Sequence, residues 1–271
     1  MPFSDPSGVI TLTTDFGHKG PFVGVMKGQI YRRFPAARIV DLGHENLAHW
    51  PAEAGFWLAR SIQYFPPGTV HVAVVDPGVG TSREIALVIT QGQLLMAPDN
   101  GLLAACFTRD PAAELRHLDI AGLSRFGIGR ASATFHGRDV FAPLAAEIAS
   151  GRHRPEELGP RVAELVPGWV EDPELSNGVV SGIVMTTDSF GNLITNIDAE
   201  LLGQLVTPRV YAANQVLSLR RTYGDVEPGQ YLALINSFGV LEIALAEGSA
   251  AEGLGLSRGA PVVVRDVARL G

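Results

Sequence analysis

Apolar residues in the first eighty positions follow two different spacings, and the first spacing is that of buried strands. The β-branched run "GVITLTTDFG" (8–17) predicts a strand that ends at Asp15. "RIVDLG" (38–43) predicts a second short strand, and "TVHVAVVDPG" (69–78) a third that ends at Asp76. Two of the three strands are therefore followed directly by an acid.

The second spacing is helical, and it fills the gaps between these strands. Residues 51–65 predict a helix that Pro66 stops, and residues 21–34 predict another. The apolar face expected for the helix at 21–34 consists of Phe22, Val25, Met26, Ile30 and Tyr31. Alternation of strand and helix predicts a mostly parallel α/β sheet, with ligands beyond the carboxyl ends of its strands.

The pattern changes after residue 83. Short strands are predicted at 85–90 and 93–98, and a helix at 138–150 that contains Pro143. The segment "VPGWVEDPELSNG" (166–178) is polar and rich in turn formers, which predicts a linker.

The chain beyond the linker has the composition of a small β domain. Two strands are predicted around "DSFGN" (188–192) and two more around "NSFG" (236–239). We therefore expect an α/β domain over 1–168 and a β-rich domain over 178–271.

Composition excludes several classes of protein. The 271 residues carry a formal net charge of −7, so a nucleic-acid-binding protein is not expected. No apolar run is long enough for a membrane helix, and the first residues lack the pattern of a signal peptide. Cys106 is the single cysteine and has no partner for an internal disulfide. Together these features predict a cytoplasmic protein.

Polar residues capable of chemistry gather in "TTDFG", "VVDPGVGTSR" and "ATFHGRDVF". Each has a structural alternative. Asp15 and Asp76, taken singly, have the positions of turn or cap residues, and His136 is as readily a hydrogen-bonded structural histidine as a base. Arg138 and Asp139 are expected to have a solvated or capping role at the start of a helix.

Common metal and nucleotide motifs are missing from the sequence. The histidines include no HExxH pair, and one cysteine cannot build a thiolate site, so no metal site is predicted. "GVGTSR" lacks the Lys-Ser/Thr of a P-loop, and there is no GxSxG elbow. What the residues offer is a metal-free set of acid, base and guanidinium, which does not by itself define a reaction.

Six motifs taken in order resemble one family. "TTDFG", "VVDPGVGTSR", "APDNG", "ATFHGRDVFAP", "DSFGNLITNI" and "NSFGVLEIA" are similar to the adenosine-forming S-adenosylmethionine hydrolases, also called S-adenosylmethionine hydroxide adenosyltransferases, which are related to the fluorinating and chlorinating enzymes. The resemblance covers about residues 9–265. It implies an N-terminal α/β sheet domain, a smaller β-barrel-like C-terminal domain, and a homotrimer with active sites between subunits.

The resemblance also implies the chemistry of the segment that begins at residue 74. The family's catalytic triad falls on Asp76, Arg83 and His136. The halogenating relatives replace this aspartate and histidine, so their presence here favours water over halide as the nucleophile. Either His136 or Asp76 could accept the proton of the attacking water, and Arg83 could stabilise the developing hydroxide.

Binding residues are implied one by one. Asp15 matches the aspartate that accepts both ribose hydroxyls, Asp188 the group that holds the methionine ammonium, and Asn192 the amide that recognises adenine. Ser237 matches a contact to the methionine moiety. Two aromatic residues complete the implied substrate-binding set: Phe190 is available for stacking on adenine, and Phe135 lines the same loop as His136. For both of them simple core packing is the alternative, and the more expected, role.

This sequence departs from the halogenating relatives around the amino-acid end of the substrate. Phe238 stands where they have an arginine, and Gly20 and Phe22 stand where they have an acid and a serine. "DSFGN" is also one residue shorter between its acid and its asparagine. Recognition of the methionine carboxylate is therefore the least defined part of the site.

The expected reaction is hydrolysis of S-adenosyl-L-methionine to adenosine and L-methionine, with no cofactor. A non-catalytic adenosine-binding protein and a halide-dependent adenosyl transferase are the alternatives that the sequence leaves open.

Overall fold

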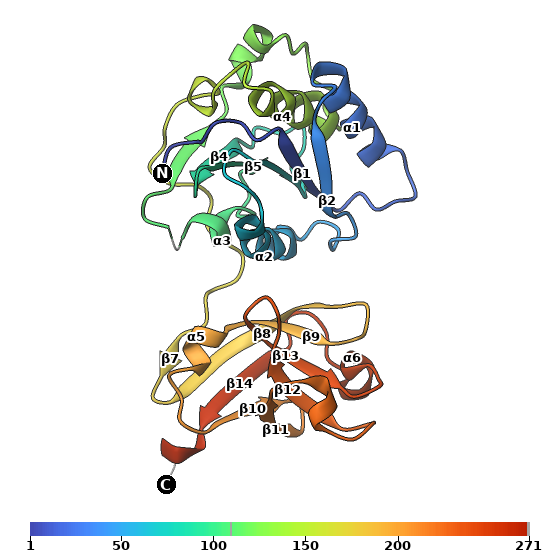
Figure 1. Cartoon of the computed structure of the whole chain (residues 1–271), viewed down its shortest axis with the longest axis vertical. Helices are drawn as coiled ribbons and strands as arrows, with labels where there is room; N and C mark the ends of the chain where they lie inside the picture. Colours follow the sequence, from blue (N-terminus) through green and yellow to red (C-terminus); the bar gives the residue numbers. More distant parts are fainter. Residues whose placement is uncertain (109, 270–271) are drawn as a thin grey trace. The chain divides into compact units, whose positions relative to one another are not determined.

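The computed structural model describes residues 1–108 and 110–269 and divides the chain into two compact units, residues 1–170 and 171–271 (Figure 1). The division falls inside the segment predicted as a linker. The first residues of that segment nevertheless belong to the N-terminal unit, because Trp169 Nε1 donates to the carbonyl of Asn100 over 2.6 Å and the amide of Val166 donates to Asp99.

The N-terminal unit is built around a six-stranded sheet of order β2-β1-β3-β5-β4-β6. Strands β2, β1, β3, β5 and β6 all run in the same direction, and β4, which pairs with β5 and β6, is antiparallel to them. The predicted mostly parallel sheet is therefore confirmed. Its strands are β1 (Val9–Thr14), β2 (Arg38–Gly43), β3 (Val70–Val74), β4 (Ile85–Thr90), β5 (Gln93–Pro98) and β6 (Glu114–His117).

Helices cover both faces of this sheet. One face packs against α1 (Phe22–Arg33) and α4 (Ala142–Ala149), the other against α2 (Pro51–Ser61) and the short α3 (Ala104–Phe107) (Figure 1). Successive strand residues supply the two faces: Val72 and Val74 pack on the α1–α4 side, and Ala73 packs on the other. Such two-sided burial explains why the strands are nearly continuous apolar runs.

The apolar face predicted for α1 is partly wrong. Met26 and Ile30 are buried as expected, but the third buried residue is Val23, and Phe22, Val25 and Tyr31 are exposed. Apolar residues occur almost all round this helix, so spacing alone could not choose which of them face the sheet.

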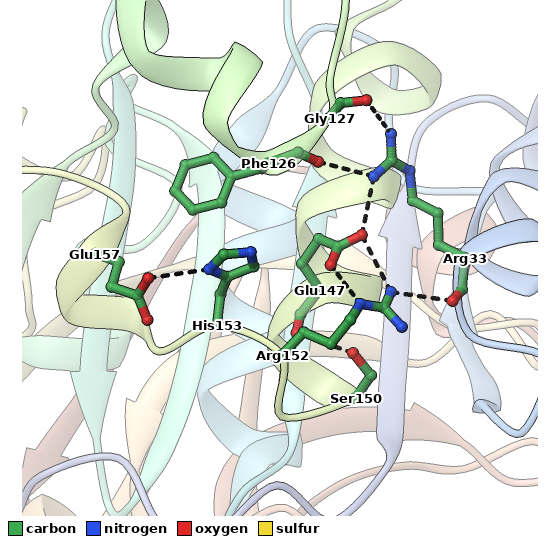
Figure 2. Close-up of polar contacts among 8 residues, drawn as sticks. All are labelled: Arg33, Phe126, Gly127, Glu147, Ser150, Arg152, His153 and Glu157. Carbon is green, nitrogen blue, oxygen red and sulfur yellow. Dashed lines mark hydrogen bonds and ion pairs between the residues drawn. The ribbon is translucent and has the colours of Figure 1, made fainter.

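A buried carboxylate holds α1 and α4 together at their C-terminal ends. Figure 2 shows Glu147 between Arg33 and Arg152, with bonds of 2.9 Å from Arg33 Nη1 and 2.6 Å from Arg152 Nε. Burial by itself raises the pKa of Glu147, but the bonds from the two guanidiniums outweigh it and hold the pKa below its usual value. Arg33 also donates to the carbonyls of Phe126 and Gly127.

The C-terminal unit is a closed seven-stranded barrel. Its strands run in the order β14-β10-β11-β12-β13-β9-β8, and β14 pairs back with β8, while the two-residue β7 extends the sheet beside β8. The predicted fold class is thus confirmed. The barrel strands are β8 (Val179–Thr187), β9 (Leu193–Asp198), β10 (Pro208–Ala212), β11 (Gln215–Arg220), β12 (Tyr231–Ile235), β13 (Val240–Leu245) and β14 (Pro261–Asp266).

Short elements complete this unit: β7 (Leu175–Ser176), α5 (Ala199–Leu202) and α6 (Ala250–Leu254). The strand pairs predicted around "DSFGN" and "NSFG" are β8–β9 and β12–β13, and both pairs are confirmed. The barrel encloses its own apolar core, which includes Val184, Ile197, Leu241, Ile243 and Val264.

Candidate active site

The turn that follows β3 folds Arg83 back onto Asp76. Thr81 fixes this turn, because its amide and hydroxyl both donate to the carbonyl of Gly78 and its Oγ1 accepts the amide of Arg83. Gly80 adopts a φ of +77°, and a Cβ built on it would lie 2.0 Å from the carbonyl oxygen of Ala133. Glycine is therefore required both by the backbone angle and by the close approach of the segment that precedes His136.

Asp76, Arg83 and His136 meet in one hydrogen-bonded group. Arg83 Nε donates to both Asp76 carboxylate oxygens over 2.9 and 3.1 Å, and Arg83 Nη2 donates to Oδ2 as well. The same Nη2 lies 2.9 Å from His136 Nδ1. The side chains of Arg83 and Asp76 are only 10% and 5% exposed, so the ion pair is screened little by water. The guanidinium is therefore the centre of the three residues.

His136 precedes a π-helical turn, Gly137–Phe141, that leads directly into α4. Such turns occur frequently at functional sites. They also explain why Pro143 is tolerated in the helix predicted at 138–150: the α-helical part begins only at Ala142, so the proline is in its first turn. Burial, and then the charge of Arg83, lower the pKa of His136, while Asp76 and Asp139 raise it in part. The lowered pKa favours the neutral imidazole.

Asp15 lies at the carboxyl edge of the sheet on the strand next to Asp76. Strands β1 and β3 are parallel neighbours with Thr14 opposite Val74, so both acids follow the ends of adjoining strands. The loop is held by Thr14 Oγ1, which accepts the amide of Phe16 and bonds to His44 Nδ1 over 2.8 Å. Asp15 Oδ2 accepts the amide of His49. One carboxylate oxygen of Asp15 thus has a main-chain partner.

Phe135 packs as the sequence predicts. Its ring makes edge-on contacts with Phe16 and Phe22 at centroid distances of 5.6 and 5.5 Å, and it lies against the core of the N-terminal unit. Phe16 follows Asp15, so this aromatic cluster joins the Asp15 loop to the segment that holds His136. Crowding around Gly137 is tight, since a Cβ there would lie 3.1 Å from both Met26 Sδ and the Phe135 ring.

Asp188 and Asn192 meet in the turn between β8 and β9 of the C-terminal unit. Asp188 Oδ1 accepts the amides of Phe190 and Asn192, each over 2.9 Å, and Asp188 Oδ2 accepts Asn192 Nδ2 over 3.0 Å. Asp188 is therefore a turn-forming residue. A carboxylate has about four acceptor positions, so these three bonds leave Oδ2 able to accept one more.

Two more residues of this unit were implied as binding residues, Phe190 and Ser237. Phe190 is more exposed than core packing allows, and Ser237 lies in a different turn from Asp188 and Asn192. Phe190 is 77% exposed, so the core-packing role predicted for it is wrong, and its ring is open to a planar partner. Ser237 is exposed in the turn between β12 and β13. Gly239 of that turn bonds to Ala199 beyond the end of β9, whereas Asn192 directly precedes the start of β9. The two turns therefore flank opposite ends of this strand.

Sequence reasoning missed two features of these sites. Glu242 is a buried acid whose Oε1 accepts the Tyr223 hydroxyl over 2.6 Å; burial, with a smaller contribution from Asp188, raises its pKa. An acid within the apolar strand "VLEIAL" was the available signal. Asp139, expected to be solvated or capping, instead accepts both the amide and the hydroxyl of Ser132, and no sequence signal marked Ser132.

Residues 1–108 and 110–269 contain no helix long and apolar enough to cross a bilayer, and no group of three or more His, Cys, Asp or Glu side chains placed to hold a metal ion. Cys106 is buried, which raises the pKa of its thiol to about 12.

Known proteins resemble this chain over nearly its whole length. The model of the SAM hydroxide adenosyltransferase N-terminal domain matches residues 10–159, and that of the C-terminal domain matches residues 182–263. The chain belongs to the SAM hydroxide adenosyltransferase family. The family resemblance expected from the six motifs is thus confirmed.

Relatives in this family include two proteins named (R)-S-adenosyl-L-methionine hydrolase. The one from Thermus thermophilus is 38% identical over 92% of this chain and 96% of its own length, and the one from Methanocaldococcus jannaschii is 32% identical over 87% and 88%. The crystal structure of an uncharacterized conserved protein from Thermotoga maritima has a TM-score of 0.85 at 35% identity, covering 94% of this chain and 99% of that one.

Proposed function

We propose that this protein hydrolyses S-adenosyl-L-methionine to adenosine and L-methionine. Water attacks ribose C5′, the C5′–S bond breaks, its electron pair returns to sulfur as the thioether of methionine, and one proton is released. Family membership supports the reaction, and the grouping of Asp76, Arg83 and His136 in one bonded set is the observation on which the mechanism rests. No cofactor is needed for this displacement, because the sulfonium is already a good leaving group.

The three residues divide the work of activating water in our proposal. Arg83 places a buried positive charge beside the position where hydroxide character develops, and it fixes the orientation of both its partners. Asp76 is the more suitable proton acceptor, since its three bonds from Arg83 leave Oδ1 able to accept one more, while His136 Nδ1 faces the guanidinium. Attack is fastest when the water oxygen, C5′ and sulfur lie in line, and this requires a rigid group of residues.

The substrate is held by residues from both units in this proposal. Asp15 accepts the ribose hydroxyls through the carboxylate positions that the His49 amide leaves free. Asp188 holds the methionine ammonium, Asn192 recognises adenine, Ser237 contacts the methionine moiety, and the exposed ring of Phe190 is available for stacking. Phe135 supports the wall beside His136.

We also propose a homotrimer in which one subunit supplies the Asp76 group and the next subunit supplies the Asp188 group, as the family resemblance implies. A cytoplasmic location is the corresponding proposal for where the reaction takes place; a single buried thiol at Cys106 is compatible with a reducing compartment.

The test is turnover of S-adenosyl-L-methionine in halide-free buffer, with adenosine and methionine measured together. We expect equal amounts of both products and loss of both in His136→Gln. His153→Gln is the matched control, because the His153 ring also bonds to a charged side chain, that of Glu157, but belongs to the separate group of Figure 2.

Two outcomes would favour the alternatives. Bound adenosine without turnover would indicate a nucleoside-binding protein, and a halogenated nucleoside formed on addition of chloride or fluoride would indicate halide-dependent transfer.

A further inference from the structure

His136 has a partner that only donates hydrogen bonds. Arg83 Nη2 lies 2.9 Å from His136 Nδ1, and a guanidinium has no acceptor. Nδ1 must therefore carry the lone pair, and in a neutral imidazole the proton is then on Nε2. The main chain of Ser132 bonds to the same ring and raises its pKa.

Ser132 is itself held by one acid. Asp139 Oδ2 accepts the Ser132 amide over 2.9 Å and the Ser132 hydroxyl over 2.6 Å, and Asp139 is oriented in turn by Arg138 Nε over 2.6 Å. These bonds, first that from Arg138, hold the pKa of Asp139 well below its usual value. The next residue, Ala133, places its carbonyl against Gly80 in the turn that holds Asp76 and Arg83. Asp139 thus fixes the segment 132–133, which lies against the turn that holds Asp76 and Arg83 and leads to His136.

We propose that Asp139 is a positioning residue for the hydrolysis, acting through Ser132 to hold His136 with its proton on Nε2 and its Nδ1 lone pair toward Arg83. This assignment rests on the proposed function for its catalytic consequence. Its structural content, the tautomer of His136, does not depend on any activity. Without the hydrogen bonds from Ser132 to Asp139, Ser132 and Ala133 can shift, and the His136 imidazole can turn or exchange tautomers. Either change misaligns the Arg83 guanidinium, which bonds to both His136 and Asp76.

The first experiment reads the tautomer directly in the full-length protein. Two-bond 1H–15N correlation spectra of protein labelled at the histidine ring nitrogens should give His136 a protonated Nε2 and an unprotonated Nδ1, and the signal missing from His136→Gln assigns it. In Asp139→Asn we expect a mixture of tautomers. A wild-type His136 protonated at Nδ1, or an unchanged Nε2–H pattern in Asp139→Asn, would overturn the proposal.

The second experiment measures kcat, KM and pH dependence. Asp139→Asn should lower kcat by roughly 10- to 100-fold and leave KM within about twofold, because the Asp139–Ser132 hydrogen bonds affect the alignment of the catalytic residues and not the affinity for the substrate. Asp76 and Asp139 raise the pKa of His136 and Arg83 lowers it, so loss of the Asp139 charge should move the acid limb of kcat to lower pH. Ser132→Ala should lower kcat less, since the hydrogen bond from the main-chain amide of residue 132 to Asp139 remains. Ser132→Thr keeps a hydroxyl at this position and should restore kcat to that of the wild type.

Glu147→Gln is the matched control. Glu147 is another acid that accepts from arginine, on the helix that continues from Asp139, but its bonds lead to Arg33 and Arg152 (Figure 2). It should be destabilised without any change in the His136 spectrum or the acid limb. Equal effects of Asp139→Asn and Glu147→Gln on kcat would reduce Asp139 to a stability role. If the wild type has no turnover but shows the Nε2–H tautomer and its loss in Asp139→Asn, the proposed function fails while the positioning of His136 stands.

Discussion

Arg83 joins two partners that a lysine could not hold at once. Its Nε and Nη2 reach Asp76, and Nη2 also reaches His136. A lysine ammonium is a point charge without this planar fork. We expect Arg83→Lys to keep the fold but to lower kcat by at least about 100-fold, as for the loss of an oriented donor to developing negative charge. Steady-state kinetics beside a thermal unfolding curve measures this. A kcat within threefold of the wild type would mean that charge alone is enough.

The buried His71 should make the free energy of unfolding depend on pH. His71 is buried between Thr11 Oγ1 and Gln93 Oε1, with ring-nitrogen distances of 2.7 and 2.5 Å, and burial lowers its pKa to about 4. The unfolded chain binds this proton near pH 6.5, so the unfolded state gains protons first and stability falls as pH drops from about 6.5 toward 4. The loss should reach roughly 2 kcal/mol between about pH 7.5 and pH 5.

Urea unfolding at these two pH values measures the effect. His71→Gln removes the titrating group and should flatten the pH dependence by about that amount, whereas the partly exposed control His153→Gln should leave it as in the wild type. Identical pH dependence in wild type and His71→Gln would contradict the role of His71.

Among the elements, the Pro/Gly-rich turn after β3 determines the geometry of the triad. Gly80→Ala would combine a φ of +77° with a Cβ 2.0 Å from the Ala133 carbonyl. Gly229→Ala has a similar φ of +81° but no atom within 4 Å of the new Cβ. We expect the control to lose about 1 kcal/mol and Gly80→Ala to lose more, with a large fall in kcat as well. Equal stability and unchanged kcat in both variants would show that the turn can move freely.

Elements with a strong local signal could be predicted from the sequence, and those chosen by tertiary packing could not. The apolar runs before Asp15 and Asp76 specify strands β1 and β3, and the parallel register then places both acids at one edge. The buried side of α1 could not be predicted from the sequence, because apolar residues lie almost all round this helix; in the structure Val23, and not Phe22, is buried. Strands β10, β11 and β14 of the barrel also escaped prediction, since their short runs gain their order from closure of the barrel.

In the candidate site too, residues that belong to a sequence motif could be predicted, and residues placed only by tertiary contacts could not. Asp76, Arg83 and His136 come from quoted motifs, and the structure brings them together. Ser132 has no motif of its own, and its function follows only from the side chain of Asp139 that reaches it from the next turn. For Phe190 the sequence left stacking and core packing as alternatives, and core packing is the one that the structure contradicts, because Phe190 is exposed in its turn.

At the scale of the whole molecule, the proposed sharing of sites between subunits gives a quantitative prediction. Asp76→Asn inactivates the N-terminal group and Asp188→Asn weakens the C-terminal group, so each homotrimer should lose activity. Co-expressed in equal amounts and assembled at random, the two variants should recover about one quarter of wild-type activity, since about one site in four would combine two intact halves. No recovery in trimers shown to contain both variants would place each site within a single subunit.

In the reaction that we propose, water activated by Asp76, Arg83 and His136 attacks C5′ of S-adenosyl-L-methionine. The most direct test is to incubate the protein with this substrate in halide-free buffer containing 18O-water and to analyse the nucleoside by mass spectrometry. We predict adenosine labelled at its 5′ oxygen, with labelled turnover lost in Asp76→Ala and His136→Ala. Adenosine formed without label, or labelled at the same rate in both variants, would contradict the account.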